Sequence, residues 1–345
     1  LPLRKIMIGQ FKNMMSGDLA IDLGTANTLI WAKGRGLLLN EPSIVAKNTL
    51  DGKIIAVGDE AKEMLGRTHS SIQTIRPLKD GVIADYNMAD AMIQGFIKKI
   101  KISRISRPRI VICIPSGITD VERRAVKESA ELANASEVLL VEEPMAAAIG
   151  IGVDVSKPEG NMIVDIGGGT TEIAVISLNG IGTKESILVA GDEQTKSILD
   201  WFRNQHKLGI GERTAENIKC TVGSAIRTET KKITVKGKDL VSGISRTLEV
   251  DSDEIRQALA ETVFQITNAI KRALDKTAPE HHSDIIDYGI ILTGGGSRLK
   301  NLDTHIKNKT GLPVHVAEHP LLSVVRGTGM IVEDVRKYRN VLIQT

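Results

Sequence analysis

The stretch IVDIGGGTTEIAV, residues 163 to 175, places an acid, bare backbone and hydroxyl groups in an order that suits phosphate chemistry. Asp165 follows an apolar run, three glycines come next, and Thr170 and Thr171 precede a second apolar run. Glycines let the backbone approach a ligand closely, and an acid and hydroxyl groups beside them could add polar contacts. The same order also suits a plain glycine hairpin. Taken alone, the stretch therefore leaves both interpretations open.

A second stretch repeats this order. Residues 20 to 28 read AIDLGTANT, and residues 163 to 171 read IVDIGGGTT. In both, an acid lies two residues before a glycine, and a second apolar run follows the threonine. Asp22 and Asp165 lie about one domain length apart, so the repeat predicts a duplicated α/β unit with one such turn in each half. For either acid alone, a strand-end residue that caps a turn remains the alternative.

A third glycine run lies in YGIILTGGGSRL, where Gly294, Gly295 and Gly296 follow an apolar run and precede a helix-like segment. A helix start offers free N–H groups to a ligand. None of the three glycine runs matches the P-loop pattern GxxxxGK[ST] or the Rossmann pattern GxGxxG. The sequence therefore predicts a nucleotide site of another kind.

The elements that must position these residues follow an α/β pattern. Apolar runs of strand length occur at residues 19–23, 28–32, 110–115, 138–141, 162–166 and 172–176, with amphipathic stretches between them. One amphipathic stretch begins at Met88. Another is announced by Thr119 and Glu122, which form a capping box, and Asn134 closes it. This alternation predicts largely buried strands covered by helices.

Composition limits the function classes. The chain has 345 residues, of which 41% are hydrophobic, 25% charged and 3% aromatic, and its formal net charge is +3. This length exceeds one hydrophobic core, so two domains or one large split domain are expected. Few aromatic residues and a small net charge argue against a nucleic-acid partner. Cys113 and Cys220 indicate reduced thiols in a cytoplasmic protein, and His281 and His282 are interpreted as surface residues of a polar loop.

The first 15 residues have a pattern that suits a membrane surface. On a helix, one apolar face would carry Leu3, Ile6, Met7 and Phe11, with lysines opposite. A short basic amphipathic helix can lie in a membrane interface. An ordinary packing helix or an unstructured tail is the alternative. No window of the chain approaches the roughly 20 apolar residues that a spanning helix needs.

Several motifs together carry a family resemblance that covers nearly the whole chain. They are DLGTANT, PSG at 115–117, VEEPMAAAIG at 141–150, DIGGGTTE and LTGGG, joined by NEPSIVA at 40–46 and RPLKDGVIADY at 76–86. The set resembles the superfamily of actins, sugar kinases and DnaK-type chaperones, and most closely the MreB family of bacterial actins.

The resemblance implies an actin-like ATPase fold, an α/β fold of two RNase H-like halves that each carry a small insertion and close on a nucleotide in a central cleft. The first half would comprise residues 1–32 and 76–145, with a C-terminal helix at about 320–345, and residues 33–75 would be its insertion. The second half would comprise residues 146–181 and 251–319, with residues 182–250 as its insertion.

The resemblance also implies a role for each site residue. The phosphates of ATP or ADP would be bound by Gly24, Thr25, Ala26 and Asn27 from one turn and by Gly167, Gly168, Gly169 and Thr171 from the other. Asp22 and Asp165 would face Mg2+, largely through water. Glu143 and Thr170 would orient the attacking water, although a glutamate at a helix start is also favoured by the helix dipole.

The adenosine end would be held by residues from two further segments. Glu216 and Lys219 share one helix face, a spacing that an ordinary surface ion pair would also show. The opposite wall would be formed by Gly294, Gly295, Gly296 and Ser297. The chain departs from the usual family pattern at Ala190, where a glycine is common, and at Thr221, where a glutamate is common. These departures bear on nucleotide affinity, not on the phosphate or metal groups.

The function that the resemblance implies is a cytoskeletal ATPase that polymerises with copies of itself on the inner face of the cytoplasmic membrane. Such filaments would organise cell-wall synthesis and rod shape, with MreC, MreD and RodZ as partners. Membrane attachment would use the N-terminal residues and the apolar Ile102 and Ile105, which lie among basic residues. The alternatives are a small-molecule kinase of the same superfamily and an ATPase switch that forms no filaments.

Overall fold

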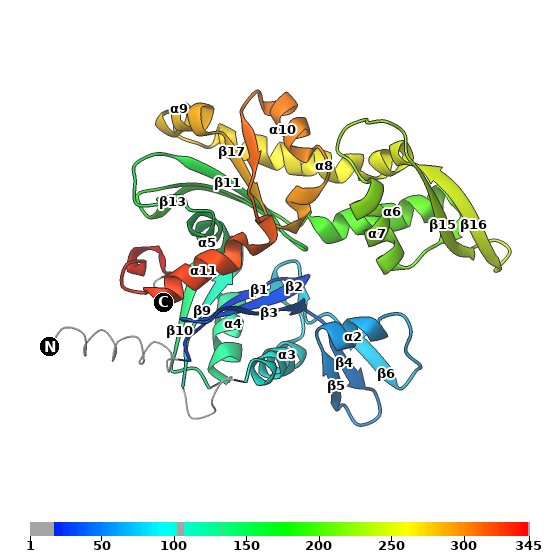
Figure 1. Ribbon diagram of the computed structural model, residues 1–345, viewed down its shortest axis with the longest axis horizontal. Coiled ribbons are helices and arrows are strands. Elements are labelled where there is room, and N and C mark those ends of the chain that lie inside the picture. The colour runs from blue at the N-terminus through cyan, green and yellow to red at the C-terminus, as the bar shows by residue number, and fades with distance from the viewer. Residues whose placement is uncertain (1–16, 102–106, 133, 344–345) are drawn as a thin grey trace. The chain divides into compact units, whose positions relative to one another are not determined.

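The computed structural model describes residues 17–101, 107–132 and 134–343, and the chain folds as two units (Figure 1). The first unit runs to Pro158 and adds residues 176–181 and the segment from Leu321 onward. The second unit comprises residues 159–175 and 182–320. The first change of unit thus falls after Pro158, later than the predicted boundary after residue 145. The predicted subdomain boundaries within the units stay predictions.

The first unit is built on a five-stranded sheet of order β10-β9-β1-β2-β3. Its strands are β1 (Leu19–Leu23), β2 (Asn27–Ala32), β3 (Gly36–Pro42), β9 (Arg109–Ile114) and β10 (Glu137–Glu142). The first three strands form an antiparallel meander, whereas β9 is parallel to β1 and β10 is parallel to β9. Because the three parallel strands end at the same edge, the residues that follow them are brought together.

Helices cover both faces of this sheet. They are α3 (Tyr86–Lys99), α4 (Asp120–Leu132), α5 (Glu143–Gly150) and α11 (Ser323–Glu333). Helix α11 packs on β1, β2 and β9, while α3 and α4 pack together on the other face (Figure 1). Helices α5 and α11 cross closely, because a Cβ on Gly327 would lie 1.8 Å from the carbonyl oxygen of Ala146. The first unit therefore needs glycine at this crossing.

A small sheet of order β5-β4-β6 follows β3 and has its own core. Its elements are β4 (Val45–Asn48), β5 (Ile54–Val57), β6 (Ile72–Ile75) and α2 (Asp59–Met64). The chain returns through a hairpin of β7 (Leu78–Lys79) and β8 (Val82–Ile83). Since β3 pairs with β2 in the larger sheet, the small sheet begins with β4.

The second unit repeats the topology of the first. Its larger sheet has the order β13-β12-β11-β17-β18, with β17 parallel to β11 and β18 parallel to β17. The strands are β11 (Asn161–Ile166), β12 (Thr171–Ser177), β13 (Gly180–Ile187), β17 (Ile290–Thr293) and β18 (Val314–Val316). In both sheets, three consecutive strands are followed by two strands added beside the first. The predicted duplication of an α/β unit is thus confirmed by strand order.

The remaining elements of the second unit surround a single large core. They are α6 (Gly191–His206), β14 (Leu208–Gly209), α7 (Glu212–Val222), β15 (Lys232–Asp239), β16 (Ser245–Asp251), α8 (Ser252–Asp275), α9 (Pro279–Tyr288) and α10 (Leu302–Thr310). Fully buried side chains such as Phe202 and Ile266 contribute about 2 kcal/mol each. His281 and His282 lie on α9, so the prediction of a loop there is wrong; Pro279 opens this helix at the position that proline favours.

Several local predictions are confirmed. The Thr119 backbone N–H donates to Glu122 Oε2 over 2.8 Å, and the Glu122 N–H donates to Thr119 Oγ1 over 3.3 Å, which is a capping box. Asn134 follows α4 in the left-handed conformation, with φ of 67°. Both cysteines are free thiols, with Cys113 buried and Cys220 exposed.

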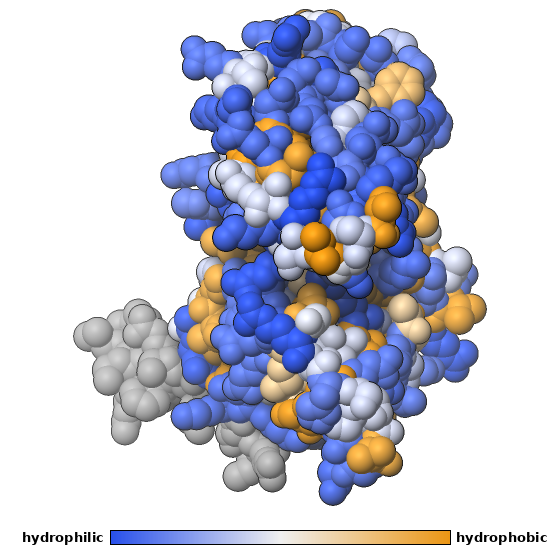
Figure 2. Space-filling model, turned by 90° about the vertical axis from the view of Figure 1, so that its right-hand side faces the viewer, coloured by the Kyte–Doolittle hydropathy of each residue, from blue (hydrophilic) through white to orange (hydrophobic). Residues whose placement is uncertain are grey.

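The membrane predictions lie outside the described part of the chain. They concern Leu3, Ile6, Met7, Phe11, Ile102 and Ile105. Across residues 17–101, 107–132 and 134–343, no helix is both long and apolar enough to cross a bilayer. The face drawn in Figure 2 is mainly hydrophilic, with apolar side chains in small separate groups.

Candidate functional site

The turn between β1 and β2 is held from two neighbouring segments. Ser43 lies between β3 and β4, and its hydroxyl donates to the carbonyl oxygen of Gly24 over 2.6 Å. Its backbone N–H donates to the carbonyl of Ala26 over 3.0 Å. The N–H of Gly81, in the β7–β8 hairpin, donates to Thr25 Oγ1 over 2.9 Å. Residues 24 to 26 are thus fixed by contacts that no local sequence pattern announces.

Asp22 lies at the carboxyl-terminal end of β1, opposite Cys113 of β9. The Cys113 thiol donates to Asp22 Oδ1 over 3.4 Å. Burial raises the pKa of Asp22 to about 6, and the hydrogen bond from Cys113 partly offsets this. Burial, followed by the charges of Asp22 and Glu143, raises the pKa of Cys113 well above its usual value. Asp22 and the first residue of α5, Glu143, therefore share one electrostatic environment in the first unit.

The corresponding turn between β11 and β12 is held by main chain. The Gly167 N–H donates to the Thr170 carbonyl over 2.9 Å and closes the turn. The first two N–H groups of α6, from Gly191 and Asp192, donate to the carbonyls of Gly167 and Gly168 over 3.1 and 2.8 Å. These donors are N–H groups that a helix start cannot satisfy within the helix.

The two threonines of this turn, Thr170 and Thr171, are both buried but differ in position and contacts. The Thr171 hydroxyl donates to the carbonyl of Val189 over 2.7 Å, and its side chain is buried. This hydroxyl thus fastens β12 to the segment ahead of α6. Thr170, also buried, lies at the end of the turn and leads into β12.

The loop after β17 packs against the end of β11. Asp165 is paired in register with Thr293, the last residue of β17. Gly294 has a φ of 79°, and a Cβ there would lie 2.4 Å from Asp165 Oδ1 and 2.3 Å from the carbonyl oxygen of Ile166. Ser297 closes the loop by donating to the Gly294 carbonyl over 2.7 Å. The acid of the second turn and the third glycine run are therefore neighbours in the second unit.

The predicted pair on α7 is part of a wider network. Lys219 Nζ lies 2.7 Å from Glu216 Oε2 and donates to the Gly191 carbonyl and to Thr195 Oγ1 over 2.8 and 2.9 Å. Burial works against the ionised form of Glu216, but the charge and hydrogen bond of Lys219 lower its pKa. The Lys219 side chain is 12% exposed and that of Glu216 is 48% exposed, so one partner of this ion pair is largely buried and the other faces solvent.

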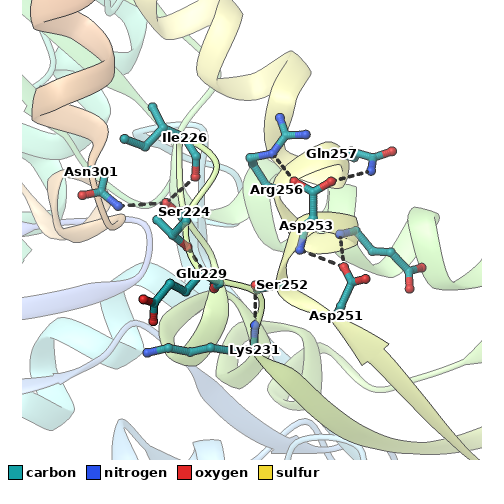
Figure 3. Close-up of polar contacts among 12 residues, drawn as sticks. Ser224, Ile226, Glu229, Lys231, Asp251, Ser252, Asp253, Arg256, Gln257 and Asn301 are labelled. Atoms are coloured by element: carbon teal, nitrogen blue, oxygen red, sulfur yellow. Dashed lines mark hydrogen bonds and ion pairs between the residues drawn. The ribbon is translucent and has the colours of Figure 1, made fainter.

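Helix α7 is fixed to the loop after β17 through its own carboxyl-terminal end (Figure 3). The Ser224 hydroxyl donates to the Ile226 carbonyl over 2.9 Å and accepts from Asn301 Nδ2 over 3.1 Å. The Ala225 N–H donates to the Lys300 carbonyl over 2.9 Å. The segment after α7 is therefore joined to the segment that follows residues 294–297.

The segment that follows in Figure 3 joins α8. Asp251 caps α8 by accepting from the N–H groups of Asp253 and Glu254, both over 2.9 Å. The Lys231 N–H donates to Ser252 Oγ over 3.0 Å. The chain from α7 to α8 is thus held at both ends.

Two departures from the family pattern have a structural account. Ala190 precedes α6 with φ of −155°, extended backbone that any residue adopts, and its methyl group lies in the core of the second unit. Glycine is therefore not required there. Thr221 donates its hydroxyl to the Asn217 carbonyl one turn earlier in α7, and the contacts that join Lys219 to Glu216 and to α6 do not include it.

The predicted metal residues fit a hydrated Mg2+ and not a protein cage. Within the described ranges, no group of three or more His, Cys, Asp and Glu side chains is placed to hold a metal ion. Mg2+ that binds with phosphates needs only one or two carboxylates. Asp22 and Asp165 each supply one beside a turn that glycine keeps narrow, since a Cβ on Gly24 would lie 2.7 Å from the Asn27 carbonyl.

The repeated five-stranded sheet, with an acid and a glycine turn after the first strand of each copy, defines the class of protein: this is an α/β protein with the actin-like fold. The family described as MreB/Mbl protein matches residues 16–340. The chain therefore belongs to the MreB/Mbl family.

Curated and solved relatives agree with this assignment. The chain is 49% identical over 336 residues to the cell shape-determining protein MreB of Escherichia coli, covering 95% of this chain and 97% of that protein. It is 48% identical over 326 residues to the cell shape-determining protein Mbl of Bacillus subtilis, covering 94% and 98%. Crystal structures of MreB5 of Spiroplasma citri match at TM-scores of 0.89 with AMPPNP bound and 0.88 with ADP bound. These two are 36% and 35% identical, covering 92% and 94% of this chain and 96% and 97% of theirs.

Proposed function

We propose that this chain binds ATP, hydrolyses it and assembles with copies of itself into filaments that determine cell shape. One observation carries the proposal. In each unit, the first strand of the larger sheet carries an acid near its end, Asp22 or Asp165, and leads into a glycine turn. The carbonyl groups of this turn accept hydrogen bonds from a neighbouring segment of the same unit. A repeat of this kind suits a molecule that holds phosphates with backbone N–H groups from two turns.

The phosphates are bound by residues 24–27 of the first unit and 167–169 of the second. The adenosine end is bound by Glu216 and Lys219 with residues 294–297. The relatives from Spiroplasma citri, bound to AMPPNP and ADP, support a nucleotide as the ligand. Mg2+, when bound with the nucleotide, supplies charge neutralisation of the phosphates, and Asp22 and Asp165 hold its water shell.

Hydrolysis depends on positioning a water molecule. Glu143 is the first residue of α5, where the helix dipole favours its ionised form. Its carboxylate accepts a hydrogen bond from the water, and Thr170 fixes the other side. Positioning and electrostatics account for most of the rate in phosphoryl transfer, so the loss of one such contact is costly.

Assembly and location rest on the family alone. The curated relatives are named cell shape-determining proteins, which supports a filament that organises cell-wall growth. Attachment to the inner membrane face and contact with MreC, MreD and RodZ stay predictions.

The test compares two adjacent acids in the full chain. Glu143→Gln is expected to lower phosphate release from Mg-ATP by about 100-fold, because a neutral amide replaces the charged carboxylate that accepts from the water. Glu142→Gln, one residue earlier, is the matched control and is expected to change release by less than about threefold. Negative-stain electron microscopy with Mg-ATP is expected to show filaments for both variants.

Three results would contradict the proposal. They are no phosphate release from the unaltered chain, equal effects of the two substitutions, and no filaments at any protein concentration. Phosphate transfer to a sugar that exceeds transfer to water would instead support the kinase alternative.

A further inference from the structure

Ser43 belongs to the motif NEPSIVA, to which the proposed function assigns no role. It lies in a short link, after Pro42 ends β3 and before Val45 begins β4. Pro42 pairs in register with Asn27, and the N–H of the next residue, Ser43, bonds across to the Ala26 carbonyl. Ser43 comes next and bonds to the turn with its N–H and its hydroxyl.

The Ser43 hydroxyl has a defined direction. Ser43 and Thr28 are both 0% exposed, and their hydroxyl oxygens lie 2.9 Å apart. A serine hydroxyl has one proton, and here it goes to the Gly24 carbonyl over 2.6 Å. The Thr28 hydroxyl is therefore the donor to Ser43 Oγ. Thr28, Ser43 and Gly24 form a buried chain of hydrogen bonds that runs toward the turn.

The geometry of the trans peptide shows how these hydrogen bonds orient the N–H groups of the turn. The Gly24 carbonyl shares a peptide group with the Thr25 N–H, and the Ala26 carbonyl shares one with the Asn27 N–H. In a trans peptide the C=O and N–H point in opposite directions, and the described residues contain no cis peptide bond. Because Ser43 holds both carbonyls on its own side, the N–H groups of Thr25 and Asn27 are directed away from it.

We infer that Ser43 is a positioning residue for the nucleotide phosphates: it binds no ligand itself, and it orients the N–H groups of Thr25 and Asn27 for a phosphate. This inference rests on the proposed function. It adds a residue that acts through the turn, and it predicts that a buried hydroxyl behind the loop tunes nucleotide affinity.

The experiment uses the full chain and three measurements. They are the Kd for Mg-AMPPNP and for Mg-ADP, the KM and kcat of phosphate release, and the unfolding midpoint without nucleotide. Ser43→Ala is expected to weaken both nucleotides by about tenfold and to raise KM to the same extent, with kcat changed by less than about threefold. This split arises because the lost contact acts on binding in the ground state and the transition state alike.

Ser129→Ala is the matched control. Ser129 lies on α4, is also 0% exposed, and its hydroxyl has no hydrogen-bond partner among the residues that the structure describes. It is expected to leave Kd and KM within about twofold of the unaltered chain. Ser43→Cys, which keeps a weak donor, is expected to recover part of the affinity.

A second pair guards against a folding defect in Ser43→Ala. Thr28→Val keeps the shape of Thr28 but removes its donor, whereas Thr28→Ser keeps the donor. The valine variant is expected to bind nucleotide about threefold more weakly than the serine variant.

The possible failures are distinct. If the unaltered chain binds neither Mg-AMPPNP nor Mg-ADP, the proposed function is wrong. If it binds both and Ser43→Ala matches Ser129→Ala, or Thr28→Val matches Thr28→Ser, the inference about Ser43 is wrong. A fall in kcat with unchanged KM would also overturn it.

Discussion

In the first unit the glycine turn is held by the hydroxyl and the backbone N–H of Ser43, whereas in the second unit the equivalent turn is held by backbone N–H groups alone. Ser43 donates its hydroxyl to Gly24, while Gly191 and Asp192 donate backbone N–H groups of α6 to Gly167 and Gly168. In both units, two carbonyl groups of the turn accept hydrogen bonds from a neighbouring segment. They differ in what a mutation can remove.

A hydroxyl is lost by changing one side chain, but a backbone N–H is lost only by introducing proline. The first anchor therefore depends on the identity of one residue. The second depends on where α6 starts, which is set by the extended Ala190 and the helix that follows. Similar hydrogen bonds to the turn carbonyls thus come from different kinds of donor, and the two turns should respond differently to substitution.

The largest expected effect is on stability, and it differs between Gly294 of the second unit and Gly24 of the first. Gly294→Ala forces a Cβ to within 2.3 Å of the Ile166 carbonyl at a φ of 79°, so it is expected to destabilise the chain by about 3 kcal/mol and lower the unfolding midpoint by about 6–12 °C. Gly24→Ala brings a Cβ to 2.7 Å from Asn27 without a positive φ, and about 1 kcal/mol is expected. Calorimetric unfolding measures both. Equal losses would show that backbone conformation does not distinguish these turns.

The next effect tests the main-chain anchor. Gly191→Pro removes the N–H that donates to Gly167, yet proline suits the first residue of a helix. We expect Mg-ADP affinity to fall by about tenfold or more, because the Gly167 carbonyl loses its donor. Equilibrium titration measures the change.

The control for this test places proline at the start of another helix. Asp120 is the first residue of α4, and Asp120→Pro is expected to leave Mg-ADP affinity within about twofold. A Gly191→Pro variant that binds as tightly as Asp120→Pro would contradict a main-chain anchor in the second unit.

The smallest effect concerns a side-chain anchor away from the turns. Glu185 of β13 forms two ion pairs. Its Oε2 lies 2.6 Å from Nζ of Lys276, the residue after α8, and its Oε1 lies 2.7 Å from Nη2 of Arg272 in α8. The hydrogen bond from Lys276, with that of Arg272, outweighs burial and lowers the Glu185 pKa from 4.5. A lowered pKa stabilises the fold at pH values above 4.5, and this contribution is lost as the pH falls through the folded-state pKa.

Glu185→Gln is therefore expected to lower the unfolding midpoint at pH 7 by about 2–4 °C, with the difference shrinking below about pH 4. The exposed pair of Glu128 and Arg124 provides the control, and Glu128→Gln is expected to have almost no effect. A difference that persists unchanged at low pH would show that the ion pairs of Glu185 do not stabilise the fold.

The sequence predicted six of the strands, β1, β2, β9, β10, β11 and β12, and the two turns, because each rests on a short-range pattern. Asp22 and Asp165 follow apolar runs of strand length, and those runs became β1 and β11 within one residue of their expected bounds. The capping box of Thr119 and Glu122 is also local, and it formed as predicted. The helix at His281 was missed because its polar composition hid the signal of Pro279.

Local patterns could not predict what holds the turns. Thr195 completes the network of Glu216 and Lys219 from another helix, and Cys113 reaches Asp22 from a strand 91 positions away. Such contacts depend on which elements become neighbours, and sequence spacing does not encode that. The partner of β3 is another such case, since β3 pairs with β2 of the larger sheet and not with β4.

By itself, the sequence determined the chemistry of this protein: two acids, three glycine runs and a family pattern that spans the chain. The bare backbone of glycine, the carboxyl group of aspartate and the hydroxyl group of threonine belong to the residue types, so a motif can indicate them. Only the tertiary structure decided how the turns are oriented. The direction of an N–H depends on what binds the carbonyl of the same peptide, and in the first turn that partner is Ser43, 19 positions from Gly24.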